Sequence, residues 1–258
     1  MIKNSVIYKG VRNLYYFSKT RLNEYKIYYR TKSIRAFKDL NKGQKCFIIG
    51  NGPSLKADDL EMLHKNKIKT FACNRIYLIF DKTNWRPDYY FISDEVFVNN
   101  DNIDSVIGNN ISKFFPLKFA DKIESANSYF YNTYQFDYEN EGKFSTDASK
   151  GVYPAGTITS EMIQFAYYMG FTEVYLLGID FSFISSNSDK DINHFTDKYS
   201  SKADGLKPLN VQANLNGYTA ARKQYEVDKR LIYNATRGGK LEVFERKDFD
   251  ILLNNINN

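Results

Sequence analysis

The sequence predicts an α/β protein with a Rossmann-like, mostly parallel sheet flanked by helices, because strand-like and helix-like segments alternate along it. Short and almost wholly apolar runs, such as residues 45–49, are typical of buried parallel strands. Segments with helical periodicity, such as residues 156–169, separate these runs. With 258 residues, of which 43% are hydrophobic, the chain is long enough to bury one substantial core.

The predicted elements follow one another from residue 43 onwards. In chain order, strands are predicted over residues 45–49, 69–73, 88–93, 173–180 and 240–244. Helices are predicted over residues 55–66, 156–169 and 218–233. The second of these helices places Met162, Phe165 and Met169 on one face, and Gly170 is suited to end it. Residues 98–150 have few clean periodicities, which predicts short strands, loops and a lid, and residues 181–217 are polar and loop-like.

The two cysteines and the absence of long apolar runs indicate the compartment. Cys46 and Cys73 each lie within a predicted strand, where cysteine usually behaves as a small buried hydrophobic residue. A chain without a disulfide framework is typical of a reducing environment. No apolar run approaches the ~18 residues of a membrane span, and the first residues do not resemble a signal peptide. We therefore expect a cytoplasmic protein.

Positive charge is concentrated in residues 1–42, which carry eleven Lys and Arg residues against Glu24 and Asp39. The rest of the chain is slightly acidic, which is unfavourable for binding nucleic acid. Aromatic residues are mixed with the basic ones, so this helical extension suits either a peripheral position on the inner face of an anionic membrane or packing on the body or on a second copy of the chain. Three parts are predicted: the extension 1–42, an α/β domain over 43–250 and an Asn-rich tail over 251–258.

The turn Gly50-Asn51-Gly52-Pro53-Ser54, which follows the first predicted strand, is the sharpest local signal. Gly50 and Gly52 permit a tight turn and a close approach of a ligand to the backbone. Pro53 suits the first turn of a helix, and Ser54 offers a hydroxyl near its positive end, which favours binding of a phosphate or ribose. The alternative is a tight strand-to-helix turn without a ligand. The pattern is neither GxGxxG nor a Walker A loop.

Polar side chains follow four of the predicted strands: Asn51, Asn74, Asp94 and Asp180. In an open parallel sheet the ligand lies beyond the carboxyl ends of the strands, so these residues predict one crevice lined by amides and carboxylates. Amides bind bases and ribose hydroxyls through paired donors and acceptors. A single strand-terminal Asp is often only a helix cap.

His194 is the candidate general base, because it lies in a polar segment after the strand that ends at Asp180. The alternative is a loop histidine without a catalytic role. His64, the other histidine, is expected on the surface of a helix, which leaves no metal site built on several histidines. Residues 234–239 are predicted to join the last helix to the last strand. Their two glycines favour a cap and turn, and the alternative places Thr236 and Arg237 near an anionic ligand.

Several of these segments resemble known proteins. Ile-Ile-Gly-Asn-Gly-Pro-Ser-Leu (48–55), Cys-Asn-Arg-Ile-Tyr (73–77) and Tyr-Leu-Leu-Gly-Ile-Asp-Phe (175–181) resemble the CMP-sialic-acid-dependent sialyltransferases of bacterial surface glycan synthesis and the broader DUF115 or MptE-like group. Gly-Thr-Ile-Thr (156–159), Asn-His-Phe-Thr-Asp-Lys-Tyr (193–199) and residues 232–244 fit the broader group better. Together these motifs span roughly residues 45–246.

The resemblance implies a GT-A-like variant of the Rossmann-like fold and a metal-independent, inverting transfer from a CMP-activated sugar to a glycan hydroxyl, with no cofactor. Asn51, Ser54 and Asn74 match family positions that contact the nucleotide, and Thr157 and Thr159 fall in the helix-start region that approaches the donor. Together with the turn and the strand ends, the residues predicted to bind the donor and its nucleotide are Gly50, Asn51, Gly52, Pro53, Ser54, Asn74, Asp94, Gly156, Thr157, Thr159 and Asp180. By the same resemblance His194 would deprotonate the acceptor hydroxyl, and Tyr199 would donate to the leaving phosphate. The sialyltransferases carry a tyrosine where this chain has Ser182 and Phe183, which leaves the donor sugar open.

Two alternatives belong to other classes. The MptE-like group includes a pterin pyrophosphokinase, which would use ATP and Mg²⁺ held by carboxylates such as Asp94 and Asp180. The chain has no dense carboxylate cluster and no lysine-bearing phosphate loop, which speaks against this reaction. The third alternative is a non-catalytic nucleotide-binding protein, in which His194 would be dispensable.

Overall fold

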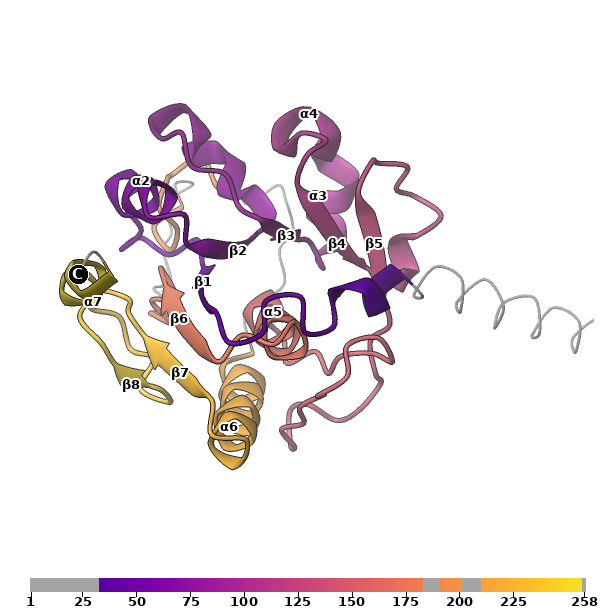
Figure 1. The fold of residues 1–258 in the computed structure, drawn as a ribbon. Helices are drawn as coiled ribbons and strands as arrows, with labels where there is room; N and C mark the ends of the chain where they lie inside the picture. The colour runs from indigo at the N-terminus through magenta and orange to yellow at the C-terminus, as the bar shows by residue number, and fades with distance from the viewer. Residues whose placement is uncertain (1–32, 183–190, 201–209, 257–258) are drawn as a thin grey trace, which may run out of the picture.

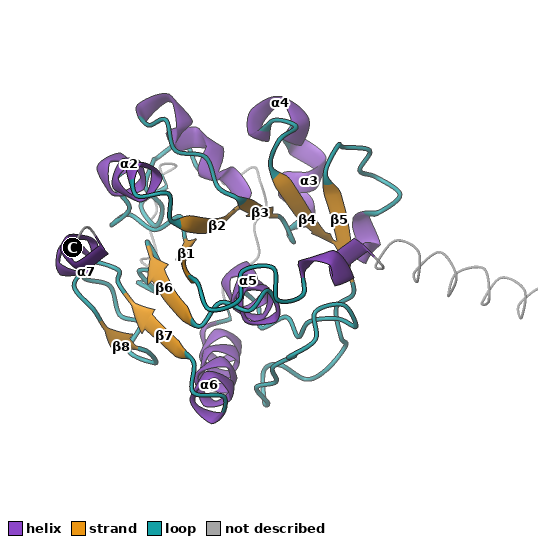
Figure 2. Ribbon diagram, in the orientation of Figure 1, coloured by secondary structure: helices purple, strands orange, loops and turns teal. Residues whose placement is uncertain are grey.

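A single parallel sheet organises the described part of the chain. The computed structural model describes residues 33–182, 191–200 and 210–256. Within these residues eight strands, all parallel to their neighbours, lie in the order β5-β4-β3-β2-β1-β6-β7-β8 (Figures 1 and 2). The strands are β1 Lys45–Ile49, β2 Lys69–Cys73, β3 Tyr89–Phe91, β4 Ser112–Pro116, β5 Ser128–Tyr131, β6 Glu173–Leu177, β7 Leu231–Asn234 and β8 Glu245–Arg246. The predicted α/β, Rossmann-like sheet is confirmed.

Helices cover both faces of the sheet. One face packs against η2 Ser33–Phe37, α5 Ile158–Tyr168 and α6 Val211–Val227. The other packs against α2 Ala57–Lys65, η3 Asn74–Lys82, α3 Glu95–Asn100, α4 Ile103–Ile107, η4 Leu117–Phe119 and α7 Phe249–Ile256. Figure 1 shows α5 and α6 below the sheet and α2, α3 and α4 above it. Because side chains alternate along a strand, Ile48 joins the first core and Ile49 the second, which explains why β1 is apolar on both of its faces.

The strand order has one switch point, between β1 and β6. From β1 the chain moves strand by strand through β2 to β5, and then returns to the other side of β1 with β6. The register pairs Ile49 with Leu177. Open α/β sheets bind ligands at the carboxyl edge beside such a switch point, which here lies after β1 and β6.

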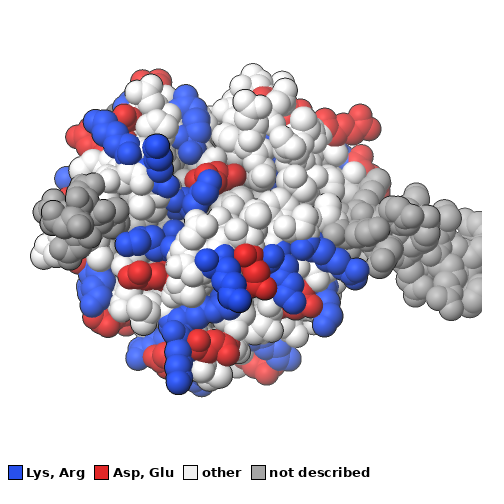
Figure 3. Space-filling view, viewed as in Figure 1, with Lys and Arg blue, Asp and Glu red and all other residues white. Residues whose placement is uncertain are grey.

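The segment before β1 forms part of the core. Ile34 and Phe37 are buried, and the backbone N–H groups of Asp39, Asn41 and Gly43 donate to carbonyls at the end of α5, with N–O distances of 2.8–3.1 Å. Figure 1 shows this indigo segment crossing in front of α5. The rest of the predicted basic extension, residues 1–32, lies outside the described residues, as do 183–190, 201–209 and 257–258. On the face in Figure 3, basic and acidic side chains are interspersed.

Within the described ranges, the helices are all too short or too polar to cross a lipid bilayer.

The predictions for the last third of the chain are wrong in two places. The helix predicted over 218–233 begins at Val211, because Asn210 caps it by accepting from Ala213 N at 3.0 Å, and ends at Val227. A turn with Lys229 at a φ of 55° follows, and residues 231–234 then form β7 beside β6. The strand predicted over 240–244 is an irregular segment held by buried Leu241 and Phe244, and β8 begins only at Glu245.

Candidate functional site

The turn after β1 is packed against the end of β6. Gly52 N donates to Gly178 O at 2.9 Å, and a Cβ added at Gly52 would lie 1.9 Å from Asp180 Oδ2. A Cβ added at Gly50 would meet Gly178 O at 2.4 Å. Both glycines are therefore required by contact between two protein segments. Pro53 and Ser54 form a turn closed by Leu55 N to Gly52 O, and α2 begins only at Ala57, so Pro53 is not in the first turn of the helix as predicted.

Ser54 and Asp180 connect the two sides of the switch point. Ser54 Oγ donates to Asp180 Oδ2 at 2.8 Å, and Ser54 N lies 3.4 Å from the same oxygen. Asp180 is 8% exposed, and burial raises the pKa of its carboxyl despite the Ser54 hydrogen bonds, which lower it. The prediction that Asn51, Asn74, Asp94 and Asp180 lie at one edge of the sheet is consistent with the order of the parallel strands.

Two asparagines, after β1 and β2, each present a buried amide oxygen without a protein partner among the described residues. Asn51 Nδ2 donates to Cys73 O at 3.2 Å, which fixes the orientation of the amide and leaves Asn51 Oδ1 unpaired. Asn74 adopts a left-handed backbone with a φ of 51°, its carbonyl accepts from Tyr90 Oη at 2.6 Å, and its Oδ1 is also unpaired. Unpaired buried acceptors are costly, so both oxygens are suited to accept hydrogen bonds from a ligand.

Asp94 has a structural partner. It is the N-cap of α3, and its Oδ1 accepts from Val96 N at 2.9 Å. This contact agrees with the alternative that a single Asp after a strand acts as a helix cap.

The start of α5 lies beside α6. Thr157 is the N-cap of α5, and its hydroxyl oxygen accepts from Thr159 N at 3.3 Å. The Tyr218 side chain on α6 is hydrogen bonded to Thr157 and Thr159 and interacts electrostatically with Cys73 at the end of β2. Burial raises the pKa of Tyr218 to about 12. Gly156, just before the cap, has a φ of 69°.

The segment 191–200 docks on the same edge. Phe195 N donates to Asn51 O at 2.9 Å, and Arg75 Nη1, at the end of β2, donates to Tyr199 O at 2.7 Å. Arg75 is itself held by Asp101, with two N–O contacts of 3.2 Å. These contacts place His194 beside the turn that follows β1.

His194 is paired with a buried carboxylate that the sequence reasoning missed. His194 Nδ1 lies 2.7 Å from Asp191 Oδ2, and the Asp191 side chain is 4% exposed. Asp191 also accepts from Ser200 Oγ and, at 2.9 Å, from Asn193 N. Burial raises the pKa of Asp191, but the Ser200 hydrogen bond, His194 and the Asn193 N–H outweigh it, so the net shift is downward. The Asp-x-x-His spacing was the signal that could have found this pair.

The pair defines how His194 can react. An ionised Asp191 holds the proton on Nδ1, so the lone pair is on Nε2, which has no hydrogen-bond partner among the described residues. Burial lowers the pKa of His194, and Asp191 opposes that shift. The ring stacks on Tyr199 with centroids 3.8 Å apart and planes 11° apart. A neutral imidazole that Asp191 holds at Nδ1 and that stacks on the Tyr199 ring is suited to act as a general base.

Tyr199 supports the imidazole from within the protein. It is 2% exposed, and burial raises the pKa of its hydroxyl well above the ordinary value, against a hydrogen bond from Asn74 that lowers it. The Tyr199 hydroxyl thus lies beside Asn74, and the Tyr199 ring stacks on the imidazole of His194. The predicted role of Tyr199 as a donor to the leaving phosphate stays a prediction.

Glu161 is a second buried acid that the sequence did not reveal, since it lies within an apolar helix. It is 4% exposed and accepts from Tyr131 Oη, and a Ser93 hydrogen bond and the charge of Lys118 also act on it. Burial raises its pKa to about 7, which these groups oppose.

The turn at 234–239 follows β7 rather than a helix, and its polar groups contact protein. Asn234 Nδ2 donates to Leu241 O at 2.8 Å, and Thr236 Oγ1 accepts from Ile179 N at 3.1 Å. Arg237 pairs with buried Asp59 at 2.5 Å and with Asp250 at 2.7 Å. The predicted helix cap is wrong, because the segment follows a strand, whereas the contacts agree with a structural turn. The alternative placed the Arg237 guanidinium near an anionic ligand, but Asp59 and Asp250 already pair with it.

Among residues 33–182, 191–200 and 210–256, no three His, Cys, Asp or Glu side chains gather in a group that could hold a metal ion.

The model of a protein family described as "6-hydroxymethylpterin diphosphokinase MptE-like" matches residues 19–186, which is more than half of the chain. The chain belongs to this MptE-like family. The match confirms the resemblance found in the motifs. The His194 segment and the turn at 234–239 lie beyond the matched residues.

Comparison of three-dimensional structures relates this MptE-like chain to a glycosyltransferase. A chain titled "Structure of MAf glycosyltransferase from Magnetospirillum magneticum AMB-1" matches with a TM-score of 0.50 and 16% sequence identity. The match covers 87% of this chain and 39% of that chain, so the likeness is to less than half of the larger protein and shows a shared fold. No curated protein matches this MptE-like chain.

Proposed function

We propose that the chain is a glycosyltransferase that moves a sugar, sialic acid or a similar one, from a CMP-activated donor to a hydroxyl of a bacterial surface glycan. The observation that carries the proposal is the Asp191–His194 pair, held by Phe195 and Arg75 beside the ends of β1 and β2. The motifs after these strands resemble those of CMP-sugar transferases. The fold shared with a glycosyltransferase structure is consistent with this function.

In the proposed reaction, His194 Nε2 accepts the proton of the glycan hydroxyl as that oxygen attacks the anomeric carbon. The new carbon–oxygen bond forms on the face opposite the phosphate, and the electron pair of the broken bond leaves with CMP, which inverts the configuration. Asp191 keeps Nε2 unprotonated and stabilises the imidazolium that forms. The N–H groups in the first turn of α5 would face the negative charge on the leaving phosphate.

The second candidate, transfer of diphosphate from ATP with Mg²⁺, is favoured by the description of the family. It would need carboxylates directed at the metal. Asp94 caps α3 and Asp180 accepts from Ser54, so both of the carboxylates considered for this role already have protein partners. A non-catalytic nucleotide-binding protein is the third candidate, and the Asp191–His194 pair argues against it.

We also propose that the basic extension contacts an anionic membrane surface on the cytoplasmic side. Since residues 33–44 pack on the core, the deletion that tests this contact should remove residues 1–32 only. The shortened protein should lose binding to phosphatidylserine vesicles and keep its thermal stability. Unchanged vesicle binding would refute the contact, and a concentration-dependent change in mass would indicate an oligomer instead.

The first experiment is a calorimetric titration with CMP, UDP, GDP and ATP, each with and without Mg²⁺. Selective, magnesium-independent binding of CMP is the expected result. Binding of ATP that requires Mg²⁺ would replace the proposal with the pyrophosphokinase. Binding of UDP or GDP would be consistent with sugar transfer but would contradict the CMP-activated donor.

A further inference from the structure

Asn214 lies at the point where α6 meets the start of α5. It is 1% exposed, and its Oδ1 has no hydrogen-bond partner among the described residues. The oxygen faces Gly156, since a Cβ added to that glycine would lie 3.4 Å from it. One turn further along α6, Tyr218 is hydrogen bonded to Thr157 and Thr159. Asn214 therefore borders the start of α5.

An unpaired buried amide oxygen destabilises a protein, so the position of the Asn214 oxygen calls for an explanation. A structural role is not evident, because the oxygen holds no neighbouring segment. The other unpaired buried atoms among the described residues are Asn51 Oδ1 and Asn74 Oδ1, which belong to the proposed nucleotide site, and Ser128 Oγ on β5. Asn214 lies beside Gly156 at the start of α5, which belongs to the same proposed site, so its oxygen would be a third amide acceptor there.

The surroundings indicate what kind of group this oxygen binds. The positive end of α5 is suited to the phosphate of a donor, and an amide oxygen repels a phosphate oxygen. The partner is therefore a hydrogen-bond donor on another part of the ligand. The hydroxyl groups of the ribose and of the transferred sugar have this chemistry.

We propose, on the basis of the proposed function, that Asn214 is a specificity-determining residue whose amide oxygen accepts a hydrogen bond from a sugar hydroxyl of the donor. The hydroxyl belongs to either the ribose or the transferred sugar. This assignment makes the start of α6 part of the wall of the donor site, beside the start of α5.

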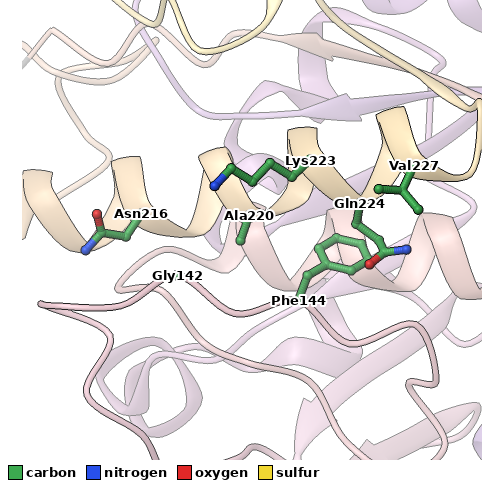
Figure 4. A pocket seen from close by; sticks show the side chains of 7 residues that line it. All are labelled: Gly142, Phe144, Asn216, Ala220, Lys223, Gln224 and Val227. Atoms are coloured by element: carbon green, nitrogen blue, oxygen red, sulfur yellow. The ribbon is translucent and has the colours of Figure 1, made fainter.

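Asn216 provides a matched control, because it is the same residue type two positions along the same helix. Its side chain points to the other side of α6, where Nδ2 donates to Glu139 O at 2.9 Å and to Tyr138 O at 3.3 Å. There it lines a groove of about 280 Å³ between α6 and the segment at Gly142 and Phe144 (Figure 4).

The test is calorimetric titration of the wild type, Asn214→Leu and Asn216→Ala with CMP, 2′,3′-dideoxy-CMP and CMP-sialic acid, together with thermal melting without ligand. Asn214→Leu should bind the ligand that carries the recognised hydroxyl about tenfold more weakly than the wild type does. It should melt at the same or a higher temperature than the wild type, because the unpaired oxygen is gone. Asn216→Ala should melt at a lower temperature and bind normally. If ribose supplies the hydroxyl, the wild type prefers CMP to the dideoxy analogue and Asn214→Leu does not.

If the transferred sugar supplies the hydroxyl, CMP binds the wild type and Asn214→Leu equally, and only CMP-sialic acid shows the loss. Equal binding of all three ligands to both proteins overturns the assignment of Asn214 and leaves the proposed function standing. A wild type that binds none of the ligands overturns both. A lower melting temperature of Asn214→Leu with unchanged binding would show that Asn214 is structural.

Discussion

The segment 191–200 and the turn at 234–239 are both polar, both lie near the carboxyl ends of strands, and both belong to motifs that the sequence analysis selected. In the turn, the polar side chains of Asn234, Thr236 and Arg237 contact protein. In the segment 191–200, the contacts of Asp191 fix His194 and leave its Nε2 without a partner in the described chain. The comparison teaches that a polar motif is a candidate for chemistry when its hydrogen bonds orient a reactive atom without engaging it.

Removing the imidazole of His194 is the strongest test of this difference between the two segments. His194→Ala should lower kcat for sugar transfer by about 10³-fold, because a positioned general base contributes about 10²–10⁴-fold. Binding of CMP should be unchanged, since no donor contact is assigned to the ring. Steady-state kinetics and calorimetry measure the two effects, and near-normal turnover would show that His194 is not the base.

Replacing the partner of the imidazole sharpens the comparison. Asp191→Asn should lower kcat by about 10²-fold, because Nδ1 is no longer held as the protonated nitrogen. The wild type should lose kcat/KM as the pH falls through a His194 pKa below 6.5, since burial lowers it. Asp191 raises that pKa, so the acid limb of the variant should move to still lower pH. An unmoved acid limb would assign it to another group.

Glu161 tests the same idea on a buried acid whose oxygen is engaged by Tyr131. Its pKa is raised from 4.5 to about 7, so its contribution to stability is fully present below pH 4.5 and is lost as the pH rises through about 7. Glu161→Gln should therefore raise the free energy of unfolding at pH 8 by up to about 3 kcal/mol and change little at pH 4.5. Urea unfolding at both pH values measures the difference. A gain of equal size at both would place the pKa of Glu161 near its ordinary value.

The smallest expected effect comes from the turn. Arg237→Ala should lower the free energy of unfolding by about 2 kcal/mol, because it leaves the carboxylate of Asp59 buried without its partner. At temperatures where the variant is folded, CMP binding should equal that of the wild type. Asp250→Ala is the control, since this carboxylate is exposed and should contribute little. Weaker CMP binding by folded Arg237→Ala would restore the anionic-ligand interpretation.

Features that depend only on neighbouring residues could be predicted from the sequence, whereas features that depend on distant contacts could not. The strands at 45–49 and 69–73 were predicted to the residue, because apolar runs bounded by turn residues depend on nothing distant. Residues 231–234 were assigned to a helix, since their strand conformation depends on pairing with β6. The sequence did not single out Asp191, Glu161 and Asn214, because the burial of a side chain and its hydrogen-bond partners are properties of the assembled fold. Gly50 and Gly52 were noticed for ligand approach, whereas their immediate requirement is the contact with residues 178–180.

The Ser54–Asp180 hydrogen bond joins residues 126 positions apart, and β1 pairs with β6 across a similar span. During synthesis, β1 therefore leaves the ribosome long before the strand that completes its other edge. Contacts of such long sequence separation form slowly, so an emerging chain exposes one edge of β1 until residues 173–180 have been made. The contact between the β1 turn and residues 178–180 cannot form before that moment. If the protein binds a nucleotide at this edge as proposed, the ligand can bind and stabilise the chain only after residues 173–180 have been made.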